Sequence, residues 1–268
     1  MKDIRYVILA GLLVGITLFF LSSPRSAIAD KVAHESAIAE SALPPAITAA
    51  VSSSDRPAAD KERDASRRPA QTMAFFGLKP GMRVADLWAG GGYMTELLAR
   101  IVGPTGKVYS QNEAFPEKFK DAETAWKARA AEPGMTNVVL VTKPFDAPDL
   151  LPVAPGTLDF AIINLNYHDL IARNHDRAKF NAAVFTALKP RGVYGIVDNS
   201  AQPGSGARDA DTLHRVDEQL EIDEISKAGF RLATDADFLR NPKDDRTLPF
   251  WKMNHQQDRF VLKFVKPE

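Results

Sequence analysis

The chain has 268 residues, of which 45% are hydrophobic and 25% charged, so it is long enough for one sizeable globular α/β domain with extensions. Lys and Arg number 34, as do Asp and Glu, so the charge balance gives no indication of a nucleic-acid partner or an anionic membrane surface. The absence of cysteine excludes a disulfide framework, a thiolate metal site and a cysteine nucleophile.

The first thirty residues have the pattern of an export signal. Lys2 and Arg5 precede an apolar run of 16 residues, Tyr6 to Leu21, and Ala27-Ile28-Ala29 is a small-x-small cleavage site. We therefore expect a signal peptide over residues 1–29, cleaved after Ala29, and a periplasmic or secreted protein. The alternative is an uncleaved membrane anchor with the domain outside the cytoplasm. If the signal is cleaved, no stable membrane span remains.

Residues 30–54 are rich in Ala and Ser and are predicted to be a linker with one short helix over 46–52. The main domain is then expected over 55–268, and it starts with a charged helical extension over 55–80. Within this extension the charges recur at three- and four-residue spacings, at Asp60, Arg63, Asp64, Arg67 and Arg68. This pattern fits either a solvated helix face or a lid over a ligand pocket, with an arginine directed at an anionic group.

The stretch that organises the domain is a strand, a glycine turn and a helix. A strand is predicted over 83–87, with Asp86 near its end, and Gly90 to Gly92 lead into a helix over 93–101. Such glycines let a ligand lie close to the backbone at a helix N-terminus. The dinucleotide fingerprint G-x-G-x-x-G does not fit, because its last position falls on Thr95.

After this unit, strands and helices continue to alternate, which predicts a doubly wound, mostly parallel sheet of about seven strands in a Rossmann-like α/β fold. Further strands are expected over 107–111, 137–142, 158–165, 193–197, 230–238 and 259–265, and further helices over 70–76, 115–131, 173–188 and 212–228.

Four motifs resemble those of class I S-adenosylmethionine-dependent methyltransferases. The glycine turn resembles the acid-x-G-x-G-x-G turn of this family, with Trp88 in place of the first glycine. The lead-in 77–81, the strand that opens on Asp159 and the turn 188–192 follow in the family's order. The similarity extends from about Arg68 to Lys266. The chain also resembles a group of exported methyltransferase-like proteins, through residues 55–60 and 240–246 and the tryptophan in the glycine turn.

The resemblance implies S-adenosylmethionine as the cofactor and a set of residues that would bind it. These are Asp86, Trp88, Gly90, Gly92, Asn112, Asp146 and Asn164. Asn112 stands where family members usually have the acid that binds both ribose hydroxyls. Two of the carboxylates have simpler alternatives. Asp86 could serve only the turn and the helix N-terminus, and Asp146 could lie in solvent.

The acceptor is expected at the carboxyl ends of the strands over 158–165 and 193–197. Catalytic candidates there are His168 as a base, Tyr167 and Asp198, and the substrate-binding candidates are His214, Arg240 and Arg246. A lone histidine is more often structural, and the charged loop 239–249 either caps the acceptor or is simply solvated. The histidine spacings match no metal motif, so no metal site is expected.

The sequence thus favours a methyltransferase that acts on a small or mid-sized acceptor outside the cytoplasm. A second hypothesis is an exported ligand-binding or sensing module that kept the fold and lost methyl transfer, which Trp88 and Asn112 favour. A third is a different transferase or lyase that uses the same pocket.

Overall fold

The computed structural model describes residues 43–268 of the chain. The predicted signal peptide and most of the predicted linker lie outside the described residues. Within the described part, no helix has both the length and the apolar character that a membrane crossing requires.

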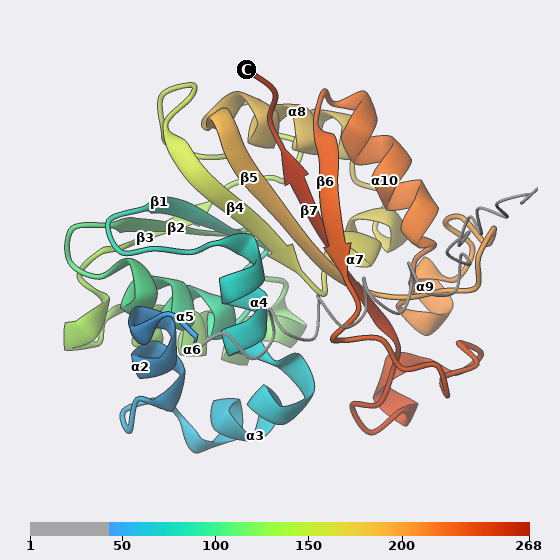
Figure 1. The fold of residues 1–268 in the computed structure, drawn as a ribbon, viewed down its shortest axis with the longest axis horizontal. Coiled ribbons are helices and arrows are strands. Elements are labelled where there is room, and N and C mark those ends of the chain that lie inside the picture. The colour runs from blue at the N-terminus through green and yellow to red at the C-terminus, as the bar shows by residue number, and fades with distance from the viewer. Residues whose placement is uncertain (1–42) are drawn as a thin grey trace, which may run out of the picture. The chain divides into compact units, whose positions relative to one another are not determined.

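The centre of this part is a seven-stranded sheet with the strand order β3-β2-β1-β4-β5-β7-β6 (Figure 1). Strands β1 to β5 are mutually parallel, and β7 runs antiparallel to both β5 and β6. The predicted doubly wound, mostly parallel sheet is therefore confirmed. The strands are β1 (Arg83–Leu87), β2 (Lys107–Asn112), β3 (Val138–Thr142), β4 (Leu158–Asn164), β5 (Leu188–Asn199), β6 (Arg231–Ala236) and β7 (Arg259–Val265).

Helices flank the sheet, and most of them start at a residue suited to a helix N-terminus. Pro69 opens α4, and the carboxylates of Asp176 and Asp217 cap α8 and α10 by accepting main-chain N–H groups. The helices are α2 (Pro45–Ser52), α3 (Ala58–Arg67), α4 (Pro69–Phe76), α5 (Tyr93–Val102), α6 (Lys120–Ala130), α7 (Tyr167–Ala172), α8 (Arg177–Ala187), α9 (Ala210–Leu213) and α10 (Glu218–Lys227), with 3-10 turns η1 (Glu117–Phe119), η2 (Pro133–Met135) and η3 (Phe250–Lys252).

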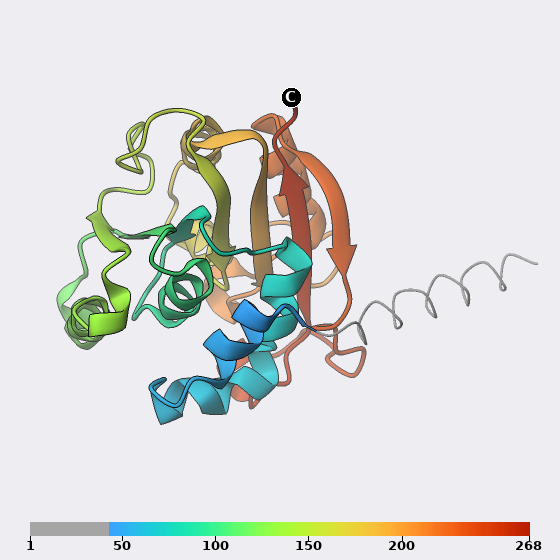
Figure 2. The same cartoon turned by 60° about the vertical axis from the view of Figure 1, so that its left-hand side comes forward.

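Each face of the sheet has its own apolar core, because successive strand residues point to opposite faces. In β4, Phe160 and Ile162 face the core shared with α2, α4 and α5, whereas Ala161 and Ile163 face the core shared with α7, α8 and α10. Figures 1 and 2 show these two groups of helices on opposite sides of the sheet. Because an apolar core covers each face, the polar side chains that follow the strands lie at the sheet's carboxyl edge.

The structure corrects three of the predicted helices. The helix predicted over 115–131 begins only at Lys120, after the 3-10 turn η1. The helix predicted over 173–188 begins at Arg177. Asn174, which has a positive φ of 56°, separates this helix from α7, and α7 itself was not predicted from the sequence. The helix predicted over 212–228 divides into α9 and α10 at His214, where φ is 49°.

Helix α2 lies in the predicted linker but is part of the folded unit. Ile47 is fully buried and Ala50 nearly so, and both belong to the core formed with α4 and α5. The opposite side of the helix, which includes Thr48, is exposed. Docking of α2 thus adds to the stability of the sheet's α5 face.

Replacement of Ile47 by alanine should lower the free energy of unfolding by roughly 2–5 kcal/mol, because it removes buried methyl groups and leaves a cavity. Thr48→Ala, one residue further on the exposed side, should change it by less than about 0.5 kcal/mol. Urea denaturation of both variants measures the difference. Equal stability of the two would place α2 outside the cooperative unit.

A buried polar network joins β1, β2, α5 and α6 beneath the glycine turn. The Thr95 hydroxyl lies 2.6 Å from the Asp86 carboxylate and 2.7 Å from the Ser110 hydroxyl, and the Trp126 indole N–H donates to Ser110 at 2.7 Å. Burial raises the pKa of Asp86 to about 7, and the hydrogen bonds from Thr95 offset only part of this effect. Asp86 is thus attached to the first turn of α5 through Thr95.

The raised pKa predicts how stability depends on pH. Between the ordinary value of 3.8 and about 7 the folded state binds more protons at Asp86 than the unfolded state. The stabilisation that Asp86 contributes is therefore present below pH 3.8 and is lost as the pH rises to about 7. Asp86→Asn should abolish this loss, which can reach roughly 4 kcal/mol at 1.36 kcal/mol for each pKa unit.

Urea denaturation of the wild type and of Asp86→Asn across this pH range measures the difference. Asp146→Asn is the matched control, because Asp146 is exposed, and it should keep the wild-type pH dependence. A wild type whose stability rises with pH over this range relative to Asp86→Asn would contradict the assignment.

Candidate functional site

Two polar regions lie at the carboxyl edge of the parallel strands. The chain proceeds from β1 outward to β2 and β3, and then returns to β4 and β5 on the other side, so the topological switch point lies between β1 and β4. Open α/β sheets bind their ligands at this point. The glycine turn, residues 88–92, follows β1, and Asn164 ends β4 at the same edge.

The glycine turn is attached to the end of β2 by two amide side chains. The Asn112 side chain accepts the Gly90 N–H at 2.9 Å and donates to the Gly90 carbonyl at 3.2 Å. Gln111 accepts the Trp88 N–H at 3.3 Å and donates to the Lys143 carbonyl at 2.9 Å. The Asn112 amide is thus engaged with the turn, at the position where a ribose-binding acid was expected.

The two glycines predicted to approach a ligand have different surroundings. Gly90 has a φ of 54°, and a Cβ atom at this position would have no neighbouring atom within 4 Å, so the backbone here is open to a ligand. Gly92 has a φ of 84°, and a Cβ there would lie 3.1 Å from the Arg129 side chain of α6. Gly90 is thus the glycine that can lie against a ligand, whereas Gly92 is required by helix packing and by its left-handed backbone.

A pocket of about 240 Å³ opens beside Gly90, and we call it the switch-point pocket. Trp88 stacks on Phe145 with ring centres 4.2 Å apart, and the Arg173 guanidinium lies 4.7 Å from the centre of the Trp88 ring. The pocket is lined by Trp88, Gly90, Asn112, Glu113, Ala114, Phe115, Pro116, Phe119, Ala122, Phe145, Asn166, Asp169 and Arg173. It combines aromatic faces with two carboxylates.

Glu113 is a pocket carboxylate that the sequence analysis did not select. One of its oxygens accepts the Phe145 N–H at 3.0 Å, and the side chain remains partly exposed at the pocket. Its position directly after β2 is the feature of the sequence that could have identified it. Of the other predicted cofactor residues, Asp146 is exposed, and neither Asp146 nor Asn164 is among the residues that line the pocket.

The second region is built on a buried histidine–carboxylate pair. His168, in α7, is 1% exposed, and its Nδ1 lies 2.6 Å from Asp198 at the end of β5. The His168 main-chain N–H donates to the other Asp198 oxygen at 2.9 Å. Burial lowers the pKa of His168, but the charge and hydrogen bond of Asp198, with the charge of Asp169, outweigh it and raise the pKa above 6.5.

Two further side chains face the free side of this imidazole. His214 Nδ1 lies 3.3 Å from His168 Nε2, and the Asp169 carboxylate lies 3.3 Å from His214 Nδ1 and 3.8 Å from His168 Nε2. We call His168, Asp169 and His214 the His–Asp cluster. Their donor atoms could hold a metal ion. Spacing motifs cannot detect such a set, because His214 comes from a distant element.

A buried glutamate supports the pair from α10. Glu221 is fully buried, and neither of its oxygens has a hydrogen-bond partner among the described residues. Burial and the charge of Asp198 raise the pKa of Glu221 well above its usual range.

The structure does not bring every catalytic candidate to this edge. Tyr167 is fully buried in the α8–α10 core, where its hydroxyl donates to Glu224 at 2.9 Å and accepts from Asn181 at 2.8 Å. Its partners therefore belong to the interior and not to the His–Asp cluster. Burial and the charge of Glu224 raise the pKa of Tyr167 well above 10.

The two predicted anion-binding arginines are paired within the protein. Arg240 donates to Glu218 at 2.6 Å, and Arg246 lies 2.9 Å from Asp258. A fully buried ion pair, Arg215 with Asp244 at 2.8 Å, anchors the loop 239–249. The charges of this loop thus hold it in place beside the site.

An aromatic wall follows this loop and was not expected from the sequence. The rings of Phe250 and Trp251 lie 5.8 Å and 5.3 Å from the His214 ring, centre to centre, and Trp251 is 55% exposed. An exposed tryptophan beside a histidine cluster is a surface on which an apolar or aromatic molecule can lie. The wall therefore borders the cluster on its solvent side.

The charged extension lies against the first turn of α5. Arg56 and Asp64 form a bidentate pair, Tyr93 donates to Asp64 at 2.7 Å, and the Arg67 guanidinium lies 4.5 Å from the centre of the Tyr93 ring. Asp60 pairs with Arg129 at 2.7 Å. The extension is thus neither a purely solvated helix nor a free segment, and it is attached next to the glycine turn.

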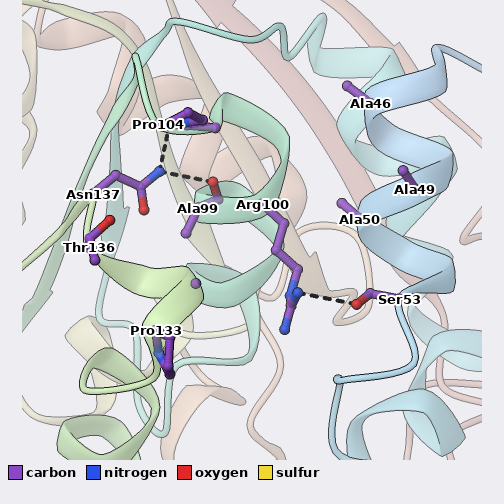
Figure 3. Close-up of a pocket in the computed structure, with 12 residues that line it drawn as sticks. Ala46, Ala49, Ala50, Ser53, Ala99, Arg100, Pro104, Pro133, Thr136 and Asn137 are labelled. Atoms are coloured by element: carbon purple, nitrogen blue, oxygen red, sulfur yellow. Dashed lines mark hydrogen bonds between the residues drawn. The ribbon is translucent and has the colours of Figure 1, made fainter.

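A larger hollow of about 450 Å³ lies elsewhere, between α2, α5 and η2 (Figure 3). Its wall consists mainly of alanine, glycine and proline, and Arg100 there donates to the Ser53 hydroxyl. One of its lining residues, Asn137, directly precedes β3, so the hollow lies at the amino ends of the strands. It has no cluster of titratable groups and lies at the edge opposite the site.

Comparison with known proteins agrees with this geometry. Residues 56–143 match the family model of protein-L-isoaspartate(D-aspartate) O-methyltransferase. These residues run from the charged extension through β1 and the glycine turn to the end of β3. They thus include the switch-point turn but not the His–Asp cluster.

Three solved structures illustrate the similarity in fold. An S-adenosylmethionine-dependent methyltransferase from Aquifex aeolicus is 19% identical with a TM-score of 0.56, covering 78% of this chain and 98% of its own. An arsenic(III) methyltransferase from Chlamydomonas reinhardtii is 18% identical with a TM-score of 0.54, covering 84% and 74%. The [4+2]-cyclase SpnF is 17% identical with a TM-score of 0.55, covering 78% and 81%.

At these identities the structures establish the fold, and the family model adds a sequence match around the glycine turn. The strand order, the turn at the switch point and this match agree with one another. The chain therefore has the fold of class I S-adenosylmethionine-dependent methyltransferases, and its residues 56–143 match a methyltransferase family model.

Proposed function

We propose that this protein transfers a methyl group from S-adenosylmethionine to a small or mid-sized acceptor that lies at the His–Asp cluster. The observation that carries the proposal is that Asp169 belongs to both regions: it lines the switch-point pocket and also contacts His214. A cofactor in the pocket and an acceptor at the cluster would therefore be adjacent.

The residues of the pocket fit the cofactor chemically. Gly90 leaves space for a ligand against the backbone, and the side chains of Trp88, Phe115 and Phe119 give the pocket an aromatic lining. Glu113 supplies a carboxylate suited to two hydroxyl groups. Among the described residues, neither Arg173, which lines the pocket, nor Arg67, which lies over Tyr93 beside the glycine turn, has a carboxylate within salt-bridge distance, so either can face the carboxylate of an amino acid moiety.

A second cation, Arg259, lies near Arg67. Arg259 is buried, and burial together with the nearby Arg67 charge lowers its pKa to about 10. Its guanidinium donates to the Ser66 carbonyl at 2.7 Å and approaches the Asn199 amide oxygen at 3.4 Å. An anionic ligand group near Arg67 would also relieve the repulsion between these two cations.

The cofactor would supply an activated methyl group on a sulfonium. The chain's own part is to orient the acceptor and remove its proton. His168 Nε2 is the base, and Asp198 holds the ring through Nδ1 and stabilises the imidazolium that forms. His214, 3.3 Å away, can pass the proton on toward solvent.

The wall of Phe250 and Trp251 indicates the kind of acceptor. A molecule with an apolar or aromatic part could lie against these rings while its protic nucleophile reaches the His–Asp cluster. Because Arg240 and Arg246 are already paired, an acceptor with a strongly anionic group is less well matched.

The place of action is proposed to be outside the cytoplasm. Its support is the pattern of positive residues, apolar run and small-x-small site in the first thirty residues.

The alternative of a ligand-binding module is favoured by one observation. The switch-point pocket of about 240 Å³ is below the roughly 300–1,000 Å³ of ordinary small-molecule sites. Trp88 occupies part of the turn, and the Asn112 amide is engaged with Gly90. A smaller ligand than the whole cofactor would fit such a pocket without movement of Phe119 or Arg173.

Isothermal titration calorimetry with S-adenosylmethionine and its demethylated product tests the proposal. We expect binding by the wild type and a loss of roughly 10- to 100-fold in affinity for Glu113→Gln, because a hydrogen bond to a charged group contributes about 1.5–3 kcal/mol. Glu117→Gln, a matched change at an exposed position four residues on, should bind as the wild type does.

Equal affinities of the two variants would remove Glu113 from the site. A folded wild type that gives no heat with either compound at millimolar concentration would remove cofactor binding and leave the ligand-binding module.

Expression of the full chain in a bacterial host with an inner and an outer membrane, followed by fractionation and N-terminal sequencing, tests the location. Periplasmic protein that starts at Asp30 is the expected result. Cytoplasmic protein with an intact N-terminus would refute export, and an intact N-terminus in the membrane fraction would indicate the anchor.

A further inference from the structure

We infer that His168, Asp169 and His214 form a binding site for one divalent transition-metal ion, with zinc as the ion that the geometry fits best. The inference does not depend on methyl transfer. It depends on the positions of three donor atoms and on the groups that hold them.

The spacing of the donor atoms matches a tetrahedral ion. Bonds of about 2.0–2.1 Å to a tetrahedral centre place neighbouring donor atoms roughly 3.4 Å apart. The two histidine nitrogens lie 3.3 Å apart, one Asp169 oxygen lies 3.3 Å from His214 Nδ1, and the other Asp169 oxygen lies 3.8 Å from His168 Nε2. One donor atom from each residue lies within 4.8 Å of the other two, so rotation of the Asp169 carboxylate would bring the three onto one ion.

The outer partners have the arrangement found around metal-binding histidines. A ligating histidine usually donates its second ring N–H to a carboxylate, which fixes the tautomer and directs the other nitrogen at the ion. Asp198 occupies this position for His168, at 2.6 Å from Nδ1, and is itself fully buried. Asn199 holds the other arm by donating to the His214 carbonyl at 3.1 Å.

The donor set selects the class of ion. Two imidazole nitrogens and one carboxylate suit zinc and other first-row transition ions, whereas magnesium and calcium prefer sites made of oxygen atoms. Three protein ligands leave a fourth position open, as in catalytic zinc sites. Asp169 also lines the switch-point pocket, so the open position can face that pocket.

An ion at this site would change the role of His168. With Nε2 bound to the metal, the imidazole no longer accepts a proton, and the ion itself would lower the pKa of an acceptor group at the open position. The acceptors that fit best are then hydroxyl or thiol groups, which bind a divalent ion as the anion. This consequence rests on the proposed function, whereas the metal site itself does not.

Metal titration of the purified full chain, after removal of ions with a chelator and dialysis, tests the inference without cofactor or acceptor. We expect one equivalent of Co²⁺ with the visible absorption of a tetrahedral site, and its displacement by Zn²⁺. His214→Ala and Asp169→Asn should weaken zinc binding by at least the roughly 10- to 100-fold that loss of an outer partner costs.

His255→Ala is the matched control, because His255 is exposed and does not belong to the cluster. It should bind the ion as the wild type does. His214 is partly exposed, so its replacement should leave the fold intact, and circular dichroism and thermal unfolding check this for each variant.

Absence of a one-to-one cobalt spectrum in the wild type would overturn the inference. Equal zinc affinity in wild type and a folded His214→Ala would overturn it as well. Calorimetry with S-adenosylmethionine in the presence of chelator separates the two proposals: zinc binding without cofactor binding keeps the metal site and rejects the methyl transfer, and the reverse result keeps the methyl transfer and rejects the metal site.

Discussion

The carboxylate of Asp198 is the group on which the geometry of the His–Asp cluster depends. It is fully buried at the end of β5, and burial of an unpaired charge costs several kcal/mol. The cost is offset by N–H donors from the His168 ring and main chain and from the Asn199 main chain, at 2.6–2.9 Å. These bonds fix the start of α7 against β5. Because Nδ1 of His168 is bound to Asp198, the free nitrogen of the ring faces His214 and Asp169.

At the switch-point pocket, the corresponding constraint is the attachment of the glycine turn to β2. The Asn112 side chain pairs with both main-chain groups of Gly90, much as a neighbouring strand would. A charged aspartate at this position could accept the Gly90 N–H but could not donate to its carbonyl. The asparagine at this position thus has a local physical reason, and the neighbouring Glu113 is a carboxylate that lines the pocket.

Charged residues in this protein are used mainly to hold segments in place beside the site. Arg215 and Asp244 anchor the loop that carries the aromatic wall, and Arg56 and Asp64 anchor α3 to the first turn of α5. Arg67 differs, because its contact is the Tyr93 ring and not a carboxylate. Among the described residues, Arg173 likewise has no carboxylate within salt-bridge distance and lies over the Trp88 ring, so these two arginines stay available near the pocket.

The sequence by itself determined the alternating strands and helices, and with them the parallel sheet and the place of the glycine turn, because apolar periodicity and glycine punctuation are local properties of the chain. It also located His168 and Asp198 at strand ends. Only the tertiary structure decided which polar groups meet: that Tyr167 turns into the core, and that His214 reaches His168 across 46 residues. Such contacts depend on how α7 and α9 pack at the sheet edge, and no spacing along the chain encodes that packing.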